Sequence, residues 1–217
     1  MKNSLRDIGP GWLRAWPITA VLIGMYGLNS GWAAIFLYHA GIVSAAFATG
    51  LKLRDALGVF RWLPAVCLWS IGVLAAPFVV ILLPWLLDSP PESVGDGLLG
   101  GLTATGLNGV HFWLFVGYLC VIHPLIEEIG WREVLFVDSK RIHLRDFEFA
   151  SYHLLVMHYF FPFEWLFFAV SLVSLAAMGW IWRLMKMKYR GIAIPTWFHA
   201  GGDLGAMLGV WWLIRGN

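Results

Sequence analysis

The sequence predicts an all-α membrane protein, a polytopic bundle of transmembrane helices. Of its 217 residues, 59% are hydrophobic and only 13% are charged, and long stretches carry no charge at all. Soluble domains have about a quarter charged residues, so a soluble domain is excluded. A chain this apolar cannot remain disordered in water either. The bilayer is therefore its expected environment.

Five long runs free of Asp, Glu, Lys and Arg supply the predicted spans. A helix needs about 20 apolar residues to cross the hydrocarbon core. The first run is long enough for two short crossings, with a break expected at residues 28–31. We predict about seven crossings, between six and eight. The runs cover residues 15–51, 62–87, 97–126, 165–182 and 191–214, the last interrupted only by Asp203.

A sixth apolar stretch, residues 149–161, predicts a helix from Asp146 to Pro162 that is short for a full crossing. The charges around the runs predict the orientation, because basic loops stay in the cytoplasm. We expect a plasma (inner) membrane protein with a cytoplasmic N-terminus, an external C-terminus and no cleavable signal peptide. The expected external loop holds Asp88, Glu92 and Asp96, and the expected cytoplasmic residues are Lys2, Arg6, Arg14, Lys52, Arg54, Arg61, Lys140, Arg141, Arg145, Arg183, Lys186, Lys188 and Arg190.

Two classes of function are disfavoured by composition. The net charge is only +2 and the basic residues form no stripe, so nucleic acid is not an expected partner. The two cysteines, Cys67 and Cys120, lie in separate apolar runs and form neither a disulfide framework nor a CxxC site.

Polar groups inside three of the apolar segments are the candidate functional residues, because buried charges in membranes are costly and often functional. Glu127 and Glu128 follow the third run, and Arg132 can pair with Glu128 across one helical turn. Glu127 then projects about 100° away, with His123 one turn before it on that face. A charged collar at a helix end is the structural alternative.

The other two segments contribute histidines and a further carboxylate. His153 follows Phe149 by four residues, and His158 lies five residues further on. His199 and Asp203 share a helical face in the final run. Carboxylates and imidazoles from three helices, converging around water, are suited to hydrolysis: one group takes the proton of water and others stabilise the oxyanion.

The order EExxxR, FxxxH and HxxxD on successive apolar segments resembles the CPBP family, the membrane-embedded CAAX proteases and bacteriocin-processing proteins also called Abi. The resemblance covers residues 110–214 and implies an intramembrane endopeptidase. It divides the chain into residues 1–109, which are N-terminal helices without a motif, and a CPBP-like core at 110–217. It also implies a catalytic set of Glu127, Glu128, Arg132, His153, His199 and Asp203.

By this resemblance Glu127 is the water-activating base, with Glu128 and Arg132 as its paired support. His153 positions the water, and His199 and Asp203 face the scissile carbonyl. Two departures from the family pattern stand out. The last position is often Asn in the family and is Asp203 here, and the interval from Glu127 to His153 is short. His158 would lengthen that interval, but Leu154 replaces the motif's Phe.

Three alternatives use the same polar residues. Zinc could be held by three of His123, Glu127, His153 and His199, although HExxH is absent and we favour a site without a cofactor. A non-catalytic scaffold or bacteriocin-immunity protein would use the cluster structurally. A transporter would use it as a proton relay, but we find no repeated halves. The expected partners of a protease are the lipid bilayer and a peptide or protein substrate, possibly lipidated.

Overall fold

The computed structural model describes residues 11–161 and 164–215, and every regular element in this part is helical. The elements are η1 (Gly11–Arg14), α1 (Trp16–Val21), η2 (Leu22–Gly27), α2 (Gly31–Ala48), α3 (Leu53–Leu57), α4 (Trp62–Ile81), α5 (Leu83–Leu86), α6 (Pro91–Ala104), α7 (Val110–Glu128), η3 (Ile129–Val134), α8 (Leu144–Phe160), α9 (Trp165–Tyr189) and α10 (Ala193–Ile214). The all-α prediction is confirmed for these residues.

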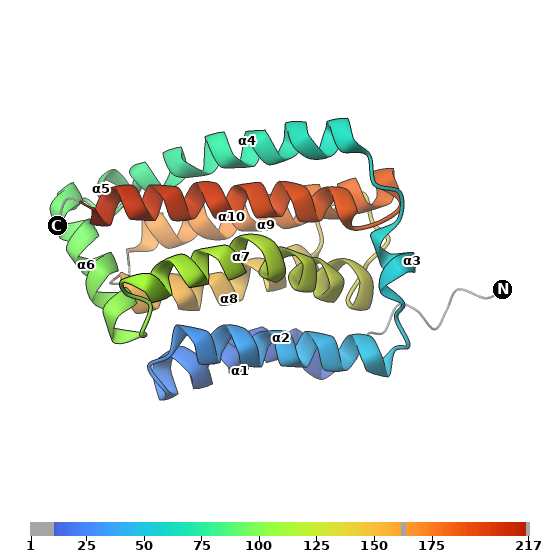
Figure 1. Cartoon of the computed structure of the whole chain (residues 1–217), viewed down its shortest axis with the longest axis horizontal. Helices are drawn as coiled ribbons and strands as arrows, with labels where there is room; N and C mark the ends of the chain where they lie inside the picture. The colour runs from blue at the N-terminus through green and yellow to red at the C-terminus, as the bar shows by residue number, and fades with distance from the viewer. Residues whose placement is uncertain (1–10, 162–163, 216–217) are drawn as a thin grey trace.

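The long helices run side by side along one axis, alternating in direction (Figure 1). α10 packs most extensively against α4, and α8 against α9. In this view, α4 forms one edge of the bundle, and α1 and α2 form the opposite edge. The turn α3 lies at the same end as the connection from α9 to α10, whereas α5, α6 and the C-terminus lie at the other end. This arrangement places the start of α10 near the end of α7.

Among the described residues, four helices are long and apolar enough to cross a membrane: α2, α4, α9 and the continuous stretch of α7 with η3. The predicted total of about seven crossings is not confirmed. α10 has 22 residues but is not one of the four. Its four glycines, together with His199 and Asp203, lower its hydropathy. The apolar helix at residues 16–27 is too short to be one of them.

Two predicted boundaries agree with the structure. The chain turns at residues 28–30, and α2 then begins with the side chain of Ser30 accepting a hydrogen bond from the Ala33 amide at 3.2 Å. α8 begins at Leu144, two residues before Asp146, and ends at Phe160. Lys2, Arg6 and Pro162, which entered the predictions of orientation and helix length, lie outside the described residues.

Candidate functional site

The two adjacent glutamates end α7 in the interior of the bundle. Glu127 and Glu128 are both 0% exposed. The chain continues directly into the π-helical turn η3, which carries Arg132 back over Glu128. π-Helical turns inside α-helices are rare and frequently lie at functional sites. A charged collar at a solvent-facing helix end would leave both carboxylates accessible, so their burial argues against that interpretation.

One carboxylate oxygen of Glu127 is held by tyrosines. Oε1 accepts a hydrogen bond from the hydroxyl of Tyr38 in α2, at 2.7 Å, and another from the hydroxyl of Tyr152 in α8. The indole of Trp131 donates in turn to the Tyr38 hydroxyl at 2.8 Å. These donors fix the orientation of the carboxylate and leave its second oxygen to face other groups.

The second oxygen of Glu127 faces two imidazoles. Its Oε2 lies 3.3 Å from Nε2 of His123 and 3.3 Å from Nε2 of His199. Within the described part of the chain, this oxygen has no hydrogen bond of good geometry. Because a buried polar atom needs a partner, a small polar group bound between the two rings would satisfy it.

Glu128 serves as the paired neighbour that the sequence predicts. Its Oε2 lies 3.4 Å from Nε of Arg132, which is the expected pair across one turn. Its Oε1 lies 3.2 Å from Nδ1 of His199. The guanidinium of Arg132 also lies over the ring of Phe149, 5.0 Å from the centroid. Glu128 therefore joins Arg132 to His199 and orients the imidazole that faces Glu127.

The final helix contributes the His199–Asp203 pair as predicted. Oδ1 of Asp203 lies 3.6 Å from Nε2 of His199. The ring of Trp182 in α9 stacks on His199, with the centroids 4.1 Å apart. Stacking on one face and polar contacts at both ring nitrogens therefore constrain this imidazole. Oδ2 of Asp203 has no hydrogen-bond partner among the described residues.

The predicted second-motif histidine lies beside the cluster. Nδ1 of His153 is 3.0 Å from the carbonyl oxygen of Phe149, and its ring packs on Tyr152 with the centroids 4.0 Å apart. His153 thus touches the tyrosine that holds Glu127. The alternative, His158, is exposed and its ring lies against Phe168. The structure therefore brings together Glu127, Glu128, Arg132, His199 and Asp203, with His153 adjoining them.

Four residues of the cluster were not in the predicted set: Tyr38, His39, His123 and Tyr152. His39 is only 4% exposed and contacts His123. A histidine within the charge-free run that became α2 could have been flagged by the same rule that singled out Glu127. The tyrosines gave no such signal, because an apolar helix commonly carries tyrosine as a packing residue.

Three groups in the cluster could hold a metal ion. One ligand atom from each of His123, Glu127 and His199 lies within 4.8 Å of the others, and all three residues are buried. Two imidazoles and one carboxylate are a ligand set that zinc accepts. The ring nitrogens of His123 and His199 that face away from Glu127 also contact polar groups, as those of metal-binding histidines usually do.

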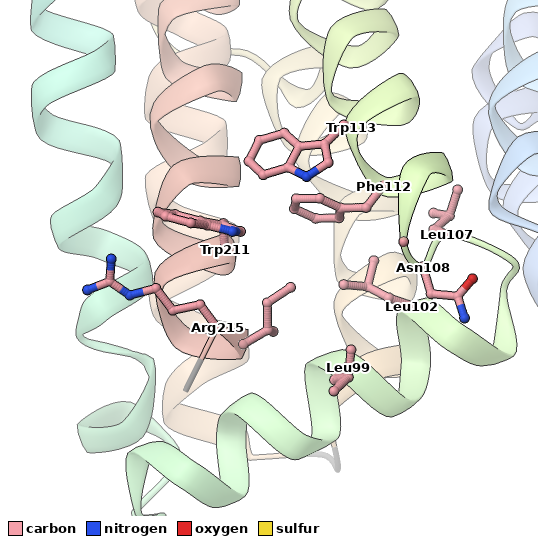
Figure 2. A pocket seen from close by; sticks show the side chains of 10 residues that line it. Leu99, Leu102, Leu107, Asn108, Phe112, Trp113, Trp211 and Arg215 are labelled. Carbon is pink, nitrogen blue, oxygen red and sulfur yellow. The ribbon is translucent and has the colours of Figure 1, made fainter. Parts of the chain in front are cut away.

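Two hollows lie near opposite ends of the bundle. An apolar groove of about 350 Å³ is lined by Ile126 and Ile129, which flank the glutamate pair, and by the end of α2 with the segment after it. The α2-side residues are Val43, Ala46, Phe47, Leu51 and Leu53. A smaller hollow of about 190 Å³ lies between α6, the start of α7 and the end of α10 (Figure 2). It is at the opposite end of α7 from Glu127.

Residues 109–205 match the family described as type II CAAX prenyl endopeptidase Rce1-like. The match includes all six predicted site residues, and it confirms the resemblance to the CPBP family that the motifs indicated. No curated protein and no solved structure matches the chain. The match and the apolar helices together indicate an integral membrane protein, and the match supports a CAAX-protease-like function.

Proposed function

We propose that the protein is a membrane-embedded endopeptidase in which Glu127 activates water. The observation that carries this proposal is the position of Glu127 Oε2, which is fully buried, lacks a hydrogen bond within the described residues and lies 3.3 Å from each of two imidazole nitrogens. A water molecule bound there could donate to the carboxylate while the imidazoles hold its oxygen. The match of residues 109–205 to a peptidase family supports the same chemistry.

In the proposed reaction, Glu127 carries one proton from the attacking water to the leaving nitrogen. Oε2 of Glu127 takes a proton from water as the water oxygen attacks the scissile carbonyl carbon. His199 and a protonated or hydrogen-bonded Asp203 face the resulting oxyanion. Glu127 then returns the proton to the leaving nitrogen as the C–N bond breaks. Glu128, held by Arg132, keeps His199 in position throughout.

The substrate we propose is a peptide whose end is apolar, either through its side chains or through an attached lipid. The groove of about 350 Å³ beside Ile126 and Ile129 is lined by apolar residues only. Phe47, on its rim, is 80% exposed, so the groove opens on the outside of the bundle. A lipid chain or an apolar peptide end lying there would bring the adjoining peptide bond towards the glutamate pair. The membrane itself would concentrate such a substrate.

The Glu127→Gln substitution tests the base directly. The amide keeps the shape of the side chain but cannot accept the proton of water, so cleavage should fall by at least about 100-fold. The assay uses protein in proteoliposomes, and prenylated and unmodified peptides ending in Cys-aliphatic-aliphatic-X, with products measured by mass spectrometry. Glu133→Gln is the matched control, because Glu133 pairs with Lys186 away from the cluster.

The outcome also separates the protease from the scaffold alternative. Retained cleavage in Glu127→Gln would overturn the base assignment. A wild-type protein that cleaves none of the peptides, combined with a lower unfolding temperature in Glu127→Gln, would favour a structural role for the cluster. Removing one member of a buried, hydrogen-bonded charge cluster commonly costs about 3–5 kcal/mol. Unfolding in detergent is therefore measured for both variants.

A metal-dependent hydrolase is the second candidate, favoured by the three ligand atoms that lie within 4.8 Å of one another. In that version His123, Glu127 and His199 would hold zinc, and the metal would activate the water. Metal analysis of the purified protein, and cleavage before and after treatment with a chelator, distinguish the two. Stoichiometric zinc whose removal abolishes cleavage would establish the metal-dependent version. Unchanged cleavage in metal-free protein would exclude it.

A further inference from the structure

His39 of α2 is bonded through both of its ring nitrogens. Its Nδ1 lies 2.7 Å from the hydroxyl of Tyr118, and its Nε2 lies 3.0 Å from Nδ1 of His123. His123 in turn presents Nε2 to Oε2 of Glu127 at 3.3 Å. The result is a continuous row of polar groups that begins at Tyr118 and ends at the free oxygen of the carboxylate.

The hydrogen-bonding capacities of these groups select one direction along the row. An ionised carboxylate only accepts, so the nitrogen of His123 that faces Glu127 carries the proton. Nδ1 of a neutral His123 then accepts, and Nε2 of His39 must be its donor. Nδ1 of His39 accepts in its turn, and the Tyr118 hydroxyl donates to it. The two hydrogen-bonded contacts, Tyr118 to His39 and His39 to His123, are both satisfied with neutral rings, and each ring is restricted to its Nε2–H tautomer.

The rings of His39, His123 and Tyr118 also lie nearly parallel to one another. The planes of His39 and His123 are 26° apart with centroids at 5.2 Å, and those of His39 and Tyr118 are 29° apart with centroids at 5.5 Å. Phe36 packs edge-on against Tyr118. The imidazole of His39 is therefore held at both ring nitrogens by side chains of α7. The ring would have to break both contacts to exchange its nitrogens, so the tautomer it imposes on His123 is stable.

We propose that His39 and Tyr118 are positioning residues, which keep the Nε2–H of His123 directed at Oε2 of Glu127. This inference rests on the proposed function, because it concerns the geometry of the water-activating carboxylate. If His123 held its proton on Nδ1 instead, two lone pairs would face each other at Glu127, and their repulsion would displace Oε2 against the tyrosine hydrogen bonds at Oε1. Misplacement of a reacting group by about 1 Å can cost about 100-fold in rate.

Two substitutions at one position separate the two contacts of His39. The side-chain amide of Asn reaches about as far as Nδ1, and that of Gln about as far as Nε2. His39→Asn should keep the Tyr118 contact and lose the His123 contact, whereas His39→Gln should do the reverse. We expect kcat to fall about 10- to 100-fold in His39→Asn and to stay within about threefold in His39→Gln, with KM unchanged in both. Equal losses in the two variants, or a loss expressed in KM, would overturn the proposal.

A spectroscopic measurement tests the tautomer without any substrate. In protein labelled with ¹⁵N-histidine, the ring nitrogens of His123 are assigned by their loss in His123→Gln. We expect a protonated Nε2 and a bare Nδ1 in the wild type and in His39→Gln, and a mixture of both tautomers in His39→Asn. An unchanged His123 tautomer in a folded His39→Asn protein would contradict the inference.

The failures of the two proposals are distinguishable. Retained cleavage in Glu127→Gln removes the base assignment but leaves the tautomer result standing. An unaltered tautomer together with an inactive Glu127→Gln removes the role of His39 and leaves the base assignment. Unfolding temperatures in detergent accompany all variants, and Tyr118→Phe, which deletes one hydroxyl and keeps the ring, serves as a milder variant if His39→Asn does not fold.

Discussion

At the scale of single residues, helical geometry pairs His123 with Glu127 and Arg132 with Glu128. A helix has 3.6 residues per turn, so residues four apart lie on one face and their side chains can meet. The structure has both pairs, at 3.3 Å and 3.4 Å. The catalytic roles of these residues stay predictions, since geometry alone does not test them.

The histidine of the FxxxH motif is either His153 or His158, and the structure allows their surroundings to be compared. His153 packs on Tyr152, whose hydroxyl donates to Glu127, whereas His158 is exposed against Phe168. We expect His153→Ala to lower kcat at least about 10-fold, because loss of its ring frees Tyr152 to move. His158→Ala should leave kcat within about twofold. Cleavage of the same peptide in proteoliposomes measures both, and a larger loss in His158→Ala would reverse the assignment.

At the scale of elements, the contact between α4 and α10 places the His199–Asp203 pair. Membrane helices approach closely where small residues face each other, because hydrocarbon tails supply no hydrophobic driving force between helices. A side chain at Gly72 would collide with the backbone of residues 198–202, and one at Gly205 would meet the backbone of α4 at 2.8 Å. The small residues of α4 and α10 therefore allow the two helices to pack closely within the chain.

Adjacent glycines of α10 provide a matched test of this contact. A Cβ on Gly201 would overlap the backbone of Trp69, whereas a Cβ on Gly202 meets nothing within 4 Å. Gly201→Ala should destabilise the protein by about 1–3 kcal/mol, the usual cost of overpacking. Gly202→Ala should be neutral or slightly stabilising, since alanine favours helix. Thermal unfolding in detergent compares them, and equal unfolding temperatures would contradict the close approach.

The whole molecule separates its charges between two ends. The connections from α2 to α4 and from α9 to α10 lie at one end, and α5, α6 and the C-terminus lie at the other (Figure 1). The first end carries basic residues such as Arg54 and Lys188, and the second carries acidic residues such as Glu92 and Asp96. Basic loops favour the cytoplasm, so we propose that the glutamate pair lies near the cytoplasmic side of a plasma membrane.

Labelling with a membrane-impermeant maleimide tests this orientation. In a background without Cys67 and Cys120, single cysteines replace Ser93 on α6 and Lys140 after η3, both of which are exposed. We expect Ser93→Cys to react in intact cells and Lys140→Cys to react only after the membrane is permeabilised. The reverse pattern would mean an inverted protein. Reaction at both sites in intact cells would contradict a single orientation across the membrane.

The order of helices and loops along the chain could be predicted from the sequence. The apolar runs, the break near residue 29, the approximate start of α8 and the distribution of charge all follow from composition and helical period, which are local properties. The resemblance of residues 110–214 to the CPBP family follows from motif order, and the match of residues 109–205 confirms it. The boundary between residues 109 and 110 as a domain division stays a prediction.

What only the tertiary structure decided is which helices meet at Glu127. The sequence assigned no functional residue to the N-terminal half, yet Tyr38 and His39 of α2 contact Glu127 and His123. It also could not decide between His153 and His158, of which only His153 adjoins the cluster. Helical period tells which residues share one helix face, but it carries no information about which face of another helix packs against it. That pairing is set by side-chain packing across the whole bundle.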